Sequence, residues 1–288
     1  MPARAPLVQF LGRVRVKFDQ IWCEMDMNRE YANAAFIPNA AEILARIERA
    51  AKDFWDNPPF AAEDIAYGPH PRQTLRLYRP EGPAKGVLVF IHGGYWLSFS
   101  PADWAHLARG ALERGWAAAL PGYILAPEAR LSAIRADLQE ALSVIAAKTT
   151  GPMVLTGHSA GGQLAARLAC EDAVQPDWRL MRVVPLSPVG ELEPMLANDM
   201  NADLKIDDAE VEAESPTRHP LAPGVSAHIW VGHQERPAFL WQARLLAERW
   251  DCPWSTAPGR NHFDVIEDLA APDTALMATL LGEGQISS

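Results

Sequence analysis

Residues 153–162 read MVLTGHSAGG, and this stretch decides how the chain is expected to fold. Apolar residues at 153–155 predict a buried strand, the letters GHSAG follow at 157–161, and a helical pattern begins directly after them. A strand, a tight turn and a helix in this order form a nucleophile elbow, in which a serine stands on a strained turn above the sheet. Glycine two positions before and after the serine removes side chains that would clash there. We therefore predict Ser159 to be a nucleophile, with a plain helix N-cap as the alternative.

Strand and helix patterns alternate on both sides of this elbow. Residues 86–91 (GVLVFI) form a continuous apolar run, which is typical of a strand buried on both faces of a parallel sheet. Other strands are predicted at 72–80 (as a half-buried edge strand), 115–123, 181–186, 226–232 and 253–258, and helices within 28–56 and at 104–114, 133–147, 161–170, 237–250 and from 264 onward. This alternation predicts an α/β fold with a mainly parallel central sheet flanked by helices.

No repeat or flexible linker divides the chain, so we expect a single α/β domain over residues 1–288. Two segments lie outside the alternating pattern: an N-terminal helical segment (1–60) and a polar, proline-rich insertion (187–225). Neither is able to build a core of its own. We expect both to pack over the end of the sheet that carries the active site.

Charge and cysteine content exclude several classes of protein. The chain carries 26 Lys and Arg against 36 Asp and Glu, a formal net charge of −10, so neither nucleic acid nor an anionic membrane surface is an expected partner. Cys23, Cys170 and Cys252 are too few and too scattered for a disulfide framework or a zinc site, and they suit a reduced, cytoplasmic environment. The sequence contains no apolar run of about 18 residues, and charges interrupt the apolar patch of 1–22, so we predict a soluble protein. No metal-ligand spacing occurs, and we expect neither a metal nor another cofactor.

A serine hydroxyl needs a base near neutral pH, and in folds with this elbow the acid and then the histidine follow the serine along the chain. Four of the eight histidines follow Ser159, namely His219, His228, His233 and His262. His219 lies in the insertion, His228 lies inside a predicted strand, and His233 lies where the acid is expected. His262 comes after the last predicted strand, on the loop that enters the final helix. It is therefore the predicted base.

The acid should follow the strand predicted at 226–232. Glu235 is the only carboxylate in the loop at 233–237, and glutamate serves this role as well as aspartate. Such an acid orients the imidazole and stabilises its charged form rather than taking its proton. We predict Glu235 as the acid and keep Asp264 and Asp207 as reserves. The alternative for Glu235 is a solvated carboxylate at a helix start.

Residues 92–96 read HGGYW directly behind the predicted strand 86–91. Acyl transfer creates an oxyanion that needs backbone N–H donors, one from the residue after the nucleophile and one from a loop of this HGG type. Ala160 is the first donor, and Gly93 and Gly94 are the candidates for the second, because glycine leaves no Cβ between the backbone and the substrate. We expect His92 to brace the loop rather than to transfer protons.

The chain resembles the kynurenine formamidase (arylformamidase) branch of the α/β-hydrolases in four stretches. These are HGGYW (92–96), GHSAGG (157–162), VGHQERPAFLWQ (231–242) and RNHFDVIEDL (260–269). The insertion from 187 to 216 is similar to that family's segment between strands, and the resemblance covers roughly 31–288. Two departures are Pro188 and Glu191, where many relatives have glycine and aspartate. The resemblance implies a triad of Ser159, Glu235 and His262, an oxyanion hole of Gly93, Gly94 and Ala160, and a pocket mouth lined by Tyr95 and Trp96, to which we add His158 as a substrate-binding residue.

The activity implied is that of a serine hydrolase that cleaves a small acyl group from an aromatic amide or ester. Its substrate is then a small molecule, either N-formylkynurenine or a short-chain ester cleaved by a general carboxylesterase. A ligand-binding homologue that has lost catalysis is the alternative from another class. The sequence leaves open whether the chain forms a homodimer.

Overall fold

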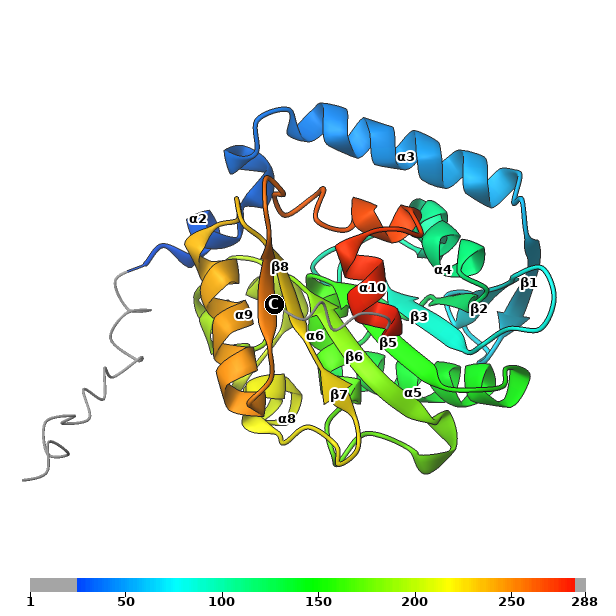
Figure 1. Ribbon diagram of the computed structural model, residues 1–288. Helices are drawn as coiled ribbons and strands as arrows, with labels where there is room; N and C mark the ends of the chain where they lie inside the picture. Colours follow the sequence, from blue (N-terminus) through cyan, green and yellow to red (C-terminus); the bar gives the residue numbers. More distant parts are fainter. Residues whose placement is uncertain (1–24, 283–288) are drawn as a thin grey trace, which may run out of the picture.

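The structure, a computed structural model, describes residues 25–282. Cys23 and the first part of the predicted segment 1–60 lie outside the described residues. The described strands form one nine-stranded sheet in the order β1-β2-β4-β3-β5-β6-β8-β9, with β7 paired to β6 (Figure 1). Their bounds are β1 Ala61–Ala66, β2 Thr74–Arg79, β3 Val87–Ile91, β4 Ala117–Pro121, β5 Met153–His158, β6 Leu180–Leu186, β7 Ser226–Ala227, β8 Ile229–Gly232 and β9 Trp254–Ala257. From β4 to β9 all pairs are parallel, whereas β2 pairs antiparallel with both β1 and β4.

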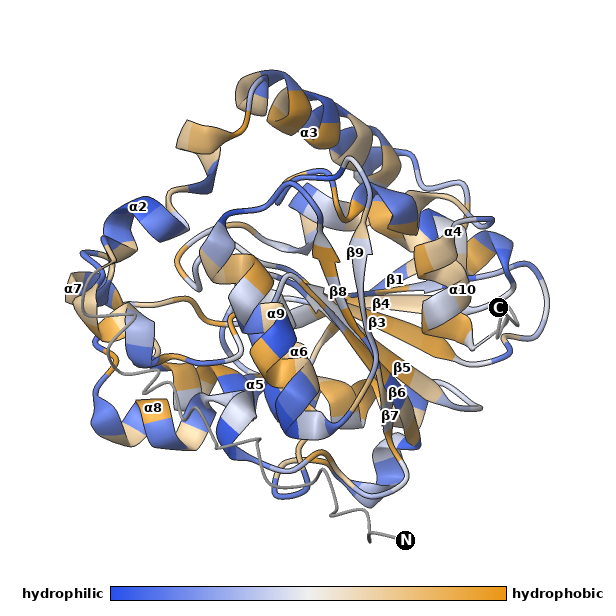
Figure 2. Ribbon diagram, turned by 60° about the vertical axis from the view of Figure 1, so that its left-hand side comes forward, coloured by the Kyte–Doolittle hydropathy of each residue, from blue (hydrophilic) through white to orange (hydrophobic). Residues whose placement is uncertain are grey.

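Helices cover both faces of the sheet (Figures 1 and 2). The α-helices are α2 Met27–Tyr31, α3 Ala40–Asp56, α4 Arg109–Glu113, α5 Leu131–Lys148, α6 Ala160–Leu168, α7 Asn201–Leu204, α8 Asp208–Glu214, α9 Pro237–Trp250 and α10 Ala275–Leu281. Short 3-10 helices are η1 Asn33–Phe36, η2 Pro101–Ala108, η3 Pro176–Trp178, η4 Glu193–Ala197, η5 Pro216–Arg218 and η6 Glu267–Ala270. One core contains side chains of α5, α6 and α9, and the other contains side chains of α3, α4 and α10.

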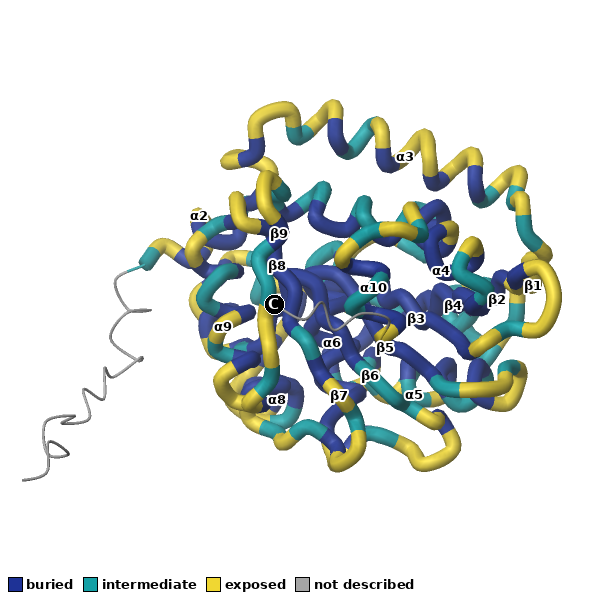
Figure 3. Tube along the Cα trace, viewed as in Figure 1, coloured by how far each residue is buried: buried dark blue, intermediate teal, exposed yellow. Residues whose placement is uncertain are grey.

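The central strands are buried on both faces, as the apolar run at 86–91 predicts. In β3, Val87, Val89 and Ile91 enter the core beneath α5 and α6, whereas Leu88 and Phe90 enter the opposite core. This division follows from the alternation of side chains along a strand. Figure 3 shows the resulting buried sheet, and above it α3, which turns one buried face inward. The predicted α/β-hydrolase architecture is therefore present.

Several predicted elements differ from those observed. The helix predicted at 104–114 is divided into η2 and α4, and the strand predicted at 226–232 into β7 and β8. The strand predicted at 72–80 is not at the edge, because β1 lies outside it. β1 is almost wholly exposed and carries two carboxylates, so its letters (AAEDIA) lack the apolar alternation that would predict a strand. The helix predicted from 264 onward is divided into η6 and α10. Pro272 disfavours a helical conformation in the residue before it, and Thr274 starts α10 afresh by accepting a hydrogen bond from the Met277 N–H at 3.1 Å.

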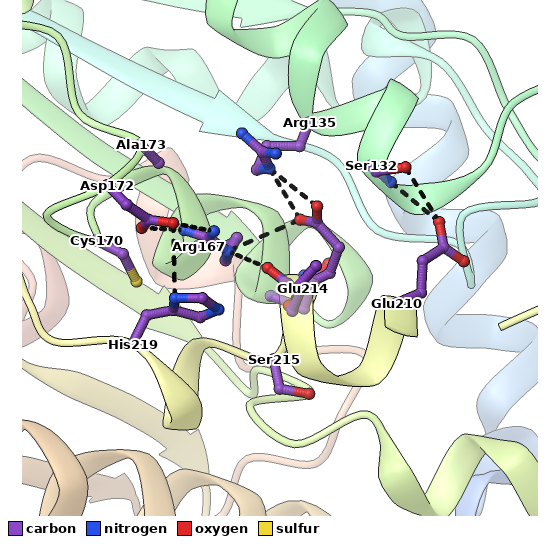
Figure 4. Close-up of polar contacts among 12 residues, drawn as sticks. Ser132, Arg135, Arg167, Cys170, Asp172, Ala173, Glu210, Glu214, Ser215 and His219 are labelled. Carbon is purple, nitrogen blue, oxygen red and sulfur yellow. Dashed lines mark hydrogen bonds and ion pairs between the residues drawn. The ribbon is translucent and has the colours of Figure 1, made fainter. Parts of the chain in front are cut away.

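The insertion at 187–225 is attached to α5 and α6 by an ionic network that is largely buried (Figure 4). Glu214 of α8 accepts a hydrogen bond from Arg135 at 3.0 Å and lies 3.8 Å from Arg167. Arg167 forms a second pair with Asp172, which lowers the pKa of that carboxyl, while burial raises the pKa of Glu214. Breaking a pair of this kind leaves a buried charge without compensation, so the network holds the insertion in one position.

Candidate active site

Ser159 occupies the turn between β5 and α6. Its backbone has φ 56° and ψ −115°, a region that L-residues seldom adopt, and its N–H donates to the Leu186 carbonyl at 2.9 Å. A Cβ at Gly157 would lie 2.2 Å from the Gly161 oxygen, and a Cβ at Gly161 would lie 2.1 Å from the Ile91 oxygen. The elbow therefore packs so tightly that only glycine fits two positions before and two positions after the serine.

His262 and Glu235 are joined by a direct hydrogen bond. His262 Nδ1 lies 2.6 Å from Glu235 Oε2, and the two side chains are 4% and 0% exposed. A carboxylate oxygen accepts, so Nδ1 carries the hydrogen and Nε2 of a neutral imidazole is free to take a proton. The other Glu235 oxygen accepts from the Gly232 N–H at 2.7 Å and from the Ser187 hydroxyl at 2.5 Å.

The elbow and His262 meet through adjacent aromatic rings. The His262 ring centroid lies 4.6 Å from that of His158, the residue before Ser159, and 4.1 Å from that of Phe239. Among the described residues no side-chain hydrogen bond joins Ser159 to His262. Such catalytic contacts commonly tighten only when substrate binds.

The two reserve acids are used elsewhere. Asp264 accepts hydrogen bonds from the backbone N–H of Asn261 at 2.7 Å and from its side-chain amide at 3.1 Å, which stabilises the loop around His262. Asp207 caps α8 by accepting from the Glu210 N–H at 2.9 Å. Of the three candidate acids, Glu235 alone contacts the imidazole.

The glycine-rich loop lies directly against the elbow. A Cβ at Gly93 would lie 2.6 Å from the His158 oxygen and 3.3 Å from Ser159 Cβ. Gly94 has φ 109°, and a Cβ there would lie 2.5 Å from the Ser98 oxygen. This close approach places the backbone of the HGG loop beside the predicted nucleophile, which is where donors to an oxyanion must lie.

His92 stabilises this loop from within. Its Nδ1–H donates to the Gly93 carbonyl at 2.8 Å, and its ring stacks on Tyr123 at 4.3 Å. The Tyr123 hydroxyl donates to the His92 carbonyl at 2.8 Å. Burial lowers the pKa of His92 to about 4, so the ring is neutral at pH 7. These contacts agree with the predicted bracing role.

The three predicted substrate-binding residues differ in environment. The half-buried Tyr95 donates its hydroxyl hydrogen to the Tyr31 carbonyl at 2.8 Å. Trp96 is 1% exposed, and its indole N–H donates to the buried Gln163 at 3.0 Å, so it supports the loop from the core. The pocket-mouth role of Trp96 stays a prediction, and its burial does not support it. His158 is buried beside His262, and burial holds its pKa well below the ordinary value.

A cavity of about 210 Å³ opens at His262 and Glu235. Its other lining residues are Asn33, Phe36, Ile37, Gln234, Arg236 and Pro237. Arg236 pairs with Glu30 of α2 and lies over the Phe36 ring at 4.0 Å from its centroid. The sequence analysis expected the N-terminal segment near the active site, but it did not identify Asn33, Phe36 and Ile37, because nothing local to 33–37 singles them out as cavity-lining residues. A larger cavity, of about 340 Å³ beside Trp55 and Arg72, touches none of the predicted site residues.

Within residues 25–282, no group of three His, Cys, Asp or Glu side chains could hold a metal ion. No helix in the same range is long and apolar enough to cross a membrane.

Known proteins share this fold and much of this sequence. A solved structure of a candidate thioesterase from a Silicibacter species is 41% identical, and the match covers 89% of this chain and 99% of that one with a TM-score of 0.86. The chain belongs to the α/β-hydrolase family. A profile of the α/β-hydrolase fold independently matches residues 88–219 of this hydrolase. Kynurenine formamidase of Danio rerio is 24% identical over 76% of this chain and 80% of its own, and that of Drosophila melanogaster is 22% identical over 82% and 87%. The predicted resemblance to the kynurenine formamidase branch is thus confirmed.

Proposed function

We propose that this α/β-hydrolase uses Ser159 to remove a small acyl group from an aromatic amide or ester. One observation carries the proposal. The 2.6 Å contact between His262 and Glu235 fixes the imidazole tautomer beside a serine that stands on a strained elbow. Geometry of this kind is the signature of a nucleophile activated by an oriented base.

In the proposed reaction, His262 Nε2 takes the Ser159 hydroxyl proton as Oγ attacks the carbonyl carbon. The N–H groups of Gly93, Gly94 and Ala160 donate to the oxyanion. His262 then gives its proton to the leaving amine or alcohol, and an acyl-enzyme remains. Water, deprotonated by His262, attacks this ester and releases the acid and free Ser159.

For the substrate, we propose N-formylkynurenine, cleaved to kynurenine and formate, a step of tryptophan catabolism. Similarity to two kynurenine formamidases supports this assignment. The cavity of about 210 Å³ suits a small substrate. We keep Tyr95 as a proposed rim residue, because Asn33, which lines the cavity, donates to the Tyr95 hydroxyl at 3.4 Å. A general short-chain carboxylesterase is the second candidate, because the 41% identical relative is described as a candidate thioesterase and thus as acting on an ester-like bond. We place the enzyme in the cytoplasm.

The test compares wild type with Ser159→Ala on N-formylkynurenine and on 4-nitrophenyl acetate. We expect Ser159→Ala to lose activity on both substrates by about 10³-fold or more, because the nucleophile is gone. Ser143→Ala is a matched control, since that hydroxyl donates to the Gln139 carbonyl at 3.0 Å, within α5 and away from the elbow. Unchanged hydrolysis by Ser159→Ala would refute the nucleophile. Good turnover of the ester without deformylation would refute the formamidase assignment and favour the carboxylesterase.

A further inference from the structure

Ser187 follows β6 and lies in an unusual backbone conformation. Its φ is 47°, in the left-handed region that favours glycine, and the residue is fully buried. The Ser187 N–H donates to the Trp230 carbonyl of β8 at 2.7 Å, which joins the ends of two neighbouring strands. A glycine would adopt this φ with less strain. A serine at this position differs from glycine only by its Cβ and its hydroxyl.

The hydroxyl points at the proposed acid of the triad. Ser187 Oγ donates to Glu235 Oε1 at 2.5 Å, across 48 positions of sequence. The same oxygen accepts the Gly232 N–H at 2.7 Å, and Oε2 accepts Nδ1–H of His262 at 2.6 Å. Three donors therefore replace the water that a fully buried carboxylate has lost.

We infer that Ser187 is a positioning residue, which acts through Glu235 to orient and polarise His262. The inference rests on the proposed serine-hydrolase function. The Gly232 N–H is fixed by the backbone and holds the Glu235 oxygen Oε1 through one hydrogen bond. The Ser187 hydroxyl donates a second hydrogen bond to the same oxygen and so restricts rotation of the carboxylate. The orientation of the imidazole depends on that of the carboxylate.

The role of Ser187 differs from that of an ordinary buried hydroxyl. Thr156 of β5 is also fully buried in the sheet, and its hydroxyl donates to the Val184 carbonyl of the neighbouring strand at 2.6 Å. That contact satisfies a hydroxyl without touching the site. Thr156 therefore provides a matched control for the loss of one buried hydrogen bond.

Loss of the Ser187 hydroxyl has two expected consequences. The carboxylate keeps a single donor on Oε1, so its ionised form is less stabilised and it holds the His262 proton more firmly. The acidic limb of the pH–rate profile should then move to higher pH. The looser imidazole should lower kcat about 10- to 100-fold, the range for a hydrogen bond to a charged group, with KM little changed.

The experiment measures kcat, KM and the pH profile with 4-nitrophenyl acetate for wild type, Ser187→Ala, Ser187→Gly and Thr156→Val. Ser187→Gly is included because it relieves the backbone strain and so keeps the test available if Ser187→Ala folds poorly. We expect both Ser187 variants to lose kcat and to shift the acidic limb. Thr156→Val should lower the urea midpoint but leave kcat and the limb unchanged.

Wild-type kcat and an unmoved limb in Ser187→Gly would overturn the inference, as would an equal loss of kcat in Thr156→Val. The proposed function fails separately, if Ser159→Ala remains active. A Ser159-dependent enzyme that tolerates Ser187→Gly would refute only the positioning role.

Discussion

Replacement of Glu235 by glutamine tests the proposed acid most directly. The carboxylate accepts at both oxygens, from His262 on one and from Ser187 and Gly232 on the other. Glutamine has nearly the same shape but one acceptor oxygen and one NH₂ donor, so it cannot meet donors on both sides. Each of its two orientations therefore has a distinct cost.

If the amide oxygen faces His262, the NH₂ group meets the Gly232 N–H, donor against donor, inside the protein. An unsatisfied buried group of this kind costs about 1–3 kcal/mol of stability. If the NH₂ group faces His262, Nδ1 must accept, and the imidazole hydrogen moves to Nε2, where the base is needed. The wrong tautomer in such a triad lowers kcat by about 10⁴, or about 5.5 kcal/mol in the activation free energy.

We expect Glu235→Gln to lose about 10³- to 10⁴-fold in kcat with 4-nitrophenyl acetate, with KM little changed. Glu235→Asp is the control, because it keeps the charge but draws the carboxylate back by about 1.5 Å, one C–C bond. It should lose less than Glu235→Gln. If Glu235→Gln keeps more than about a tenth of wild-type kcat, the acid is wrongly assigned.

Three further changes test other parts of the molecule. Gly93→Ala places a Cβ 2.6 Å from a carbonyl oxygen of the elbow, and the displaced loop should lower kcat at least about 100-fold, as loss of an oxyanion donor does. Glu214→Gln removes the charge between Arg135 and Arg167, and the free energy of unfolding in urea should fall by about 3–5 kcal/mol. His106→Gln should flatten the pH dependence of the urea midpoint. Burial lowers the pKa of His106 from 6.5 to about 4, so over that interval the unfolded chain binds a proton that the folded chain refuses, and stability falls as the pH falls.

Each of these three predictions has an outcome that would contradict it. Wild-type kcat in Gly93→Ala would mean that the loop does not hold the oxyanion. For Glu214→Gln the control is Glu113→Gln, which breaks a more exposed pair 3.9 Å from Arg109 and should change stability by less than about 0.5 kcal/mol. Equal losses would show that burial of Glu214 has no special cost. An unaltered pH slope in His106→Gln would show that this ring is protonated equally in both states.

Sequence alone predicted the features that depend on short stretches of chain. The elbow is local, since glycine at 157 and 161 is required within one turn of Ser159. Burial on both faces of β3 follows from one apolar run. Chain order, together with the rule that triad partners follow parallel strands, was enough to nominate His262 and Glu235.

Tertiary structure decided the features that depend on packing between distant segments. Glu235 contacts His262 across 27 positions of sequence, whereas Asp264, only two residues from the histidine, bonds instead to Asn261. Trp96 lies two residues after the glycine pair of the HGG loop, yet its indole is buried in the core, where Gln163 accepts its hydrogen bond.

Ser187 has no motif of its own, and only its left-handed backbone and its distance to Glu235 show what its hydroxyl contacts. The physical reason is general to this fold. A strand's residues determine which face each side chain takes, but the partner of that side chain is set by which loops the sheet brings to the same edge.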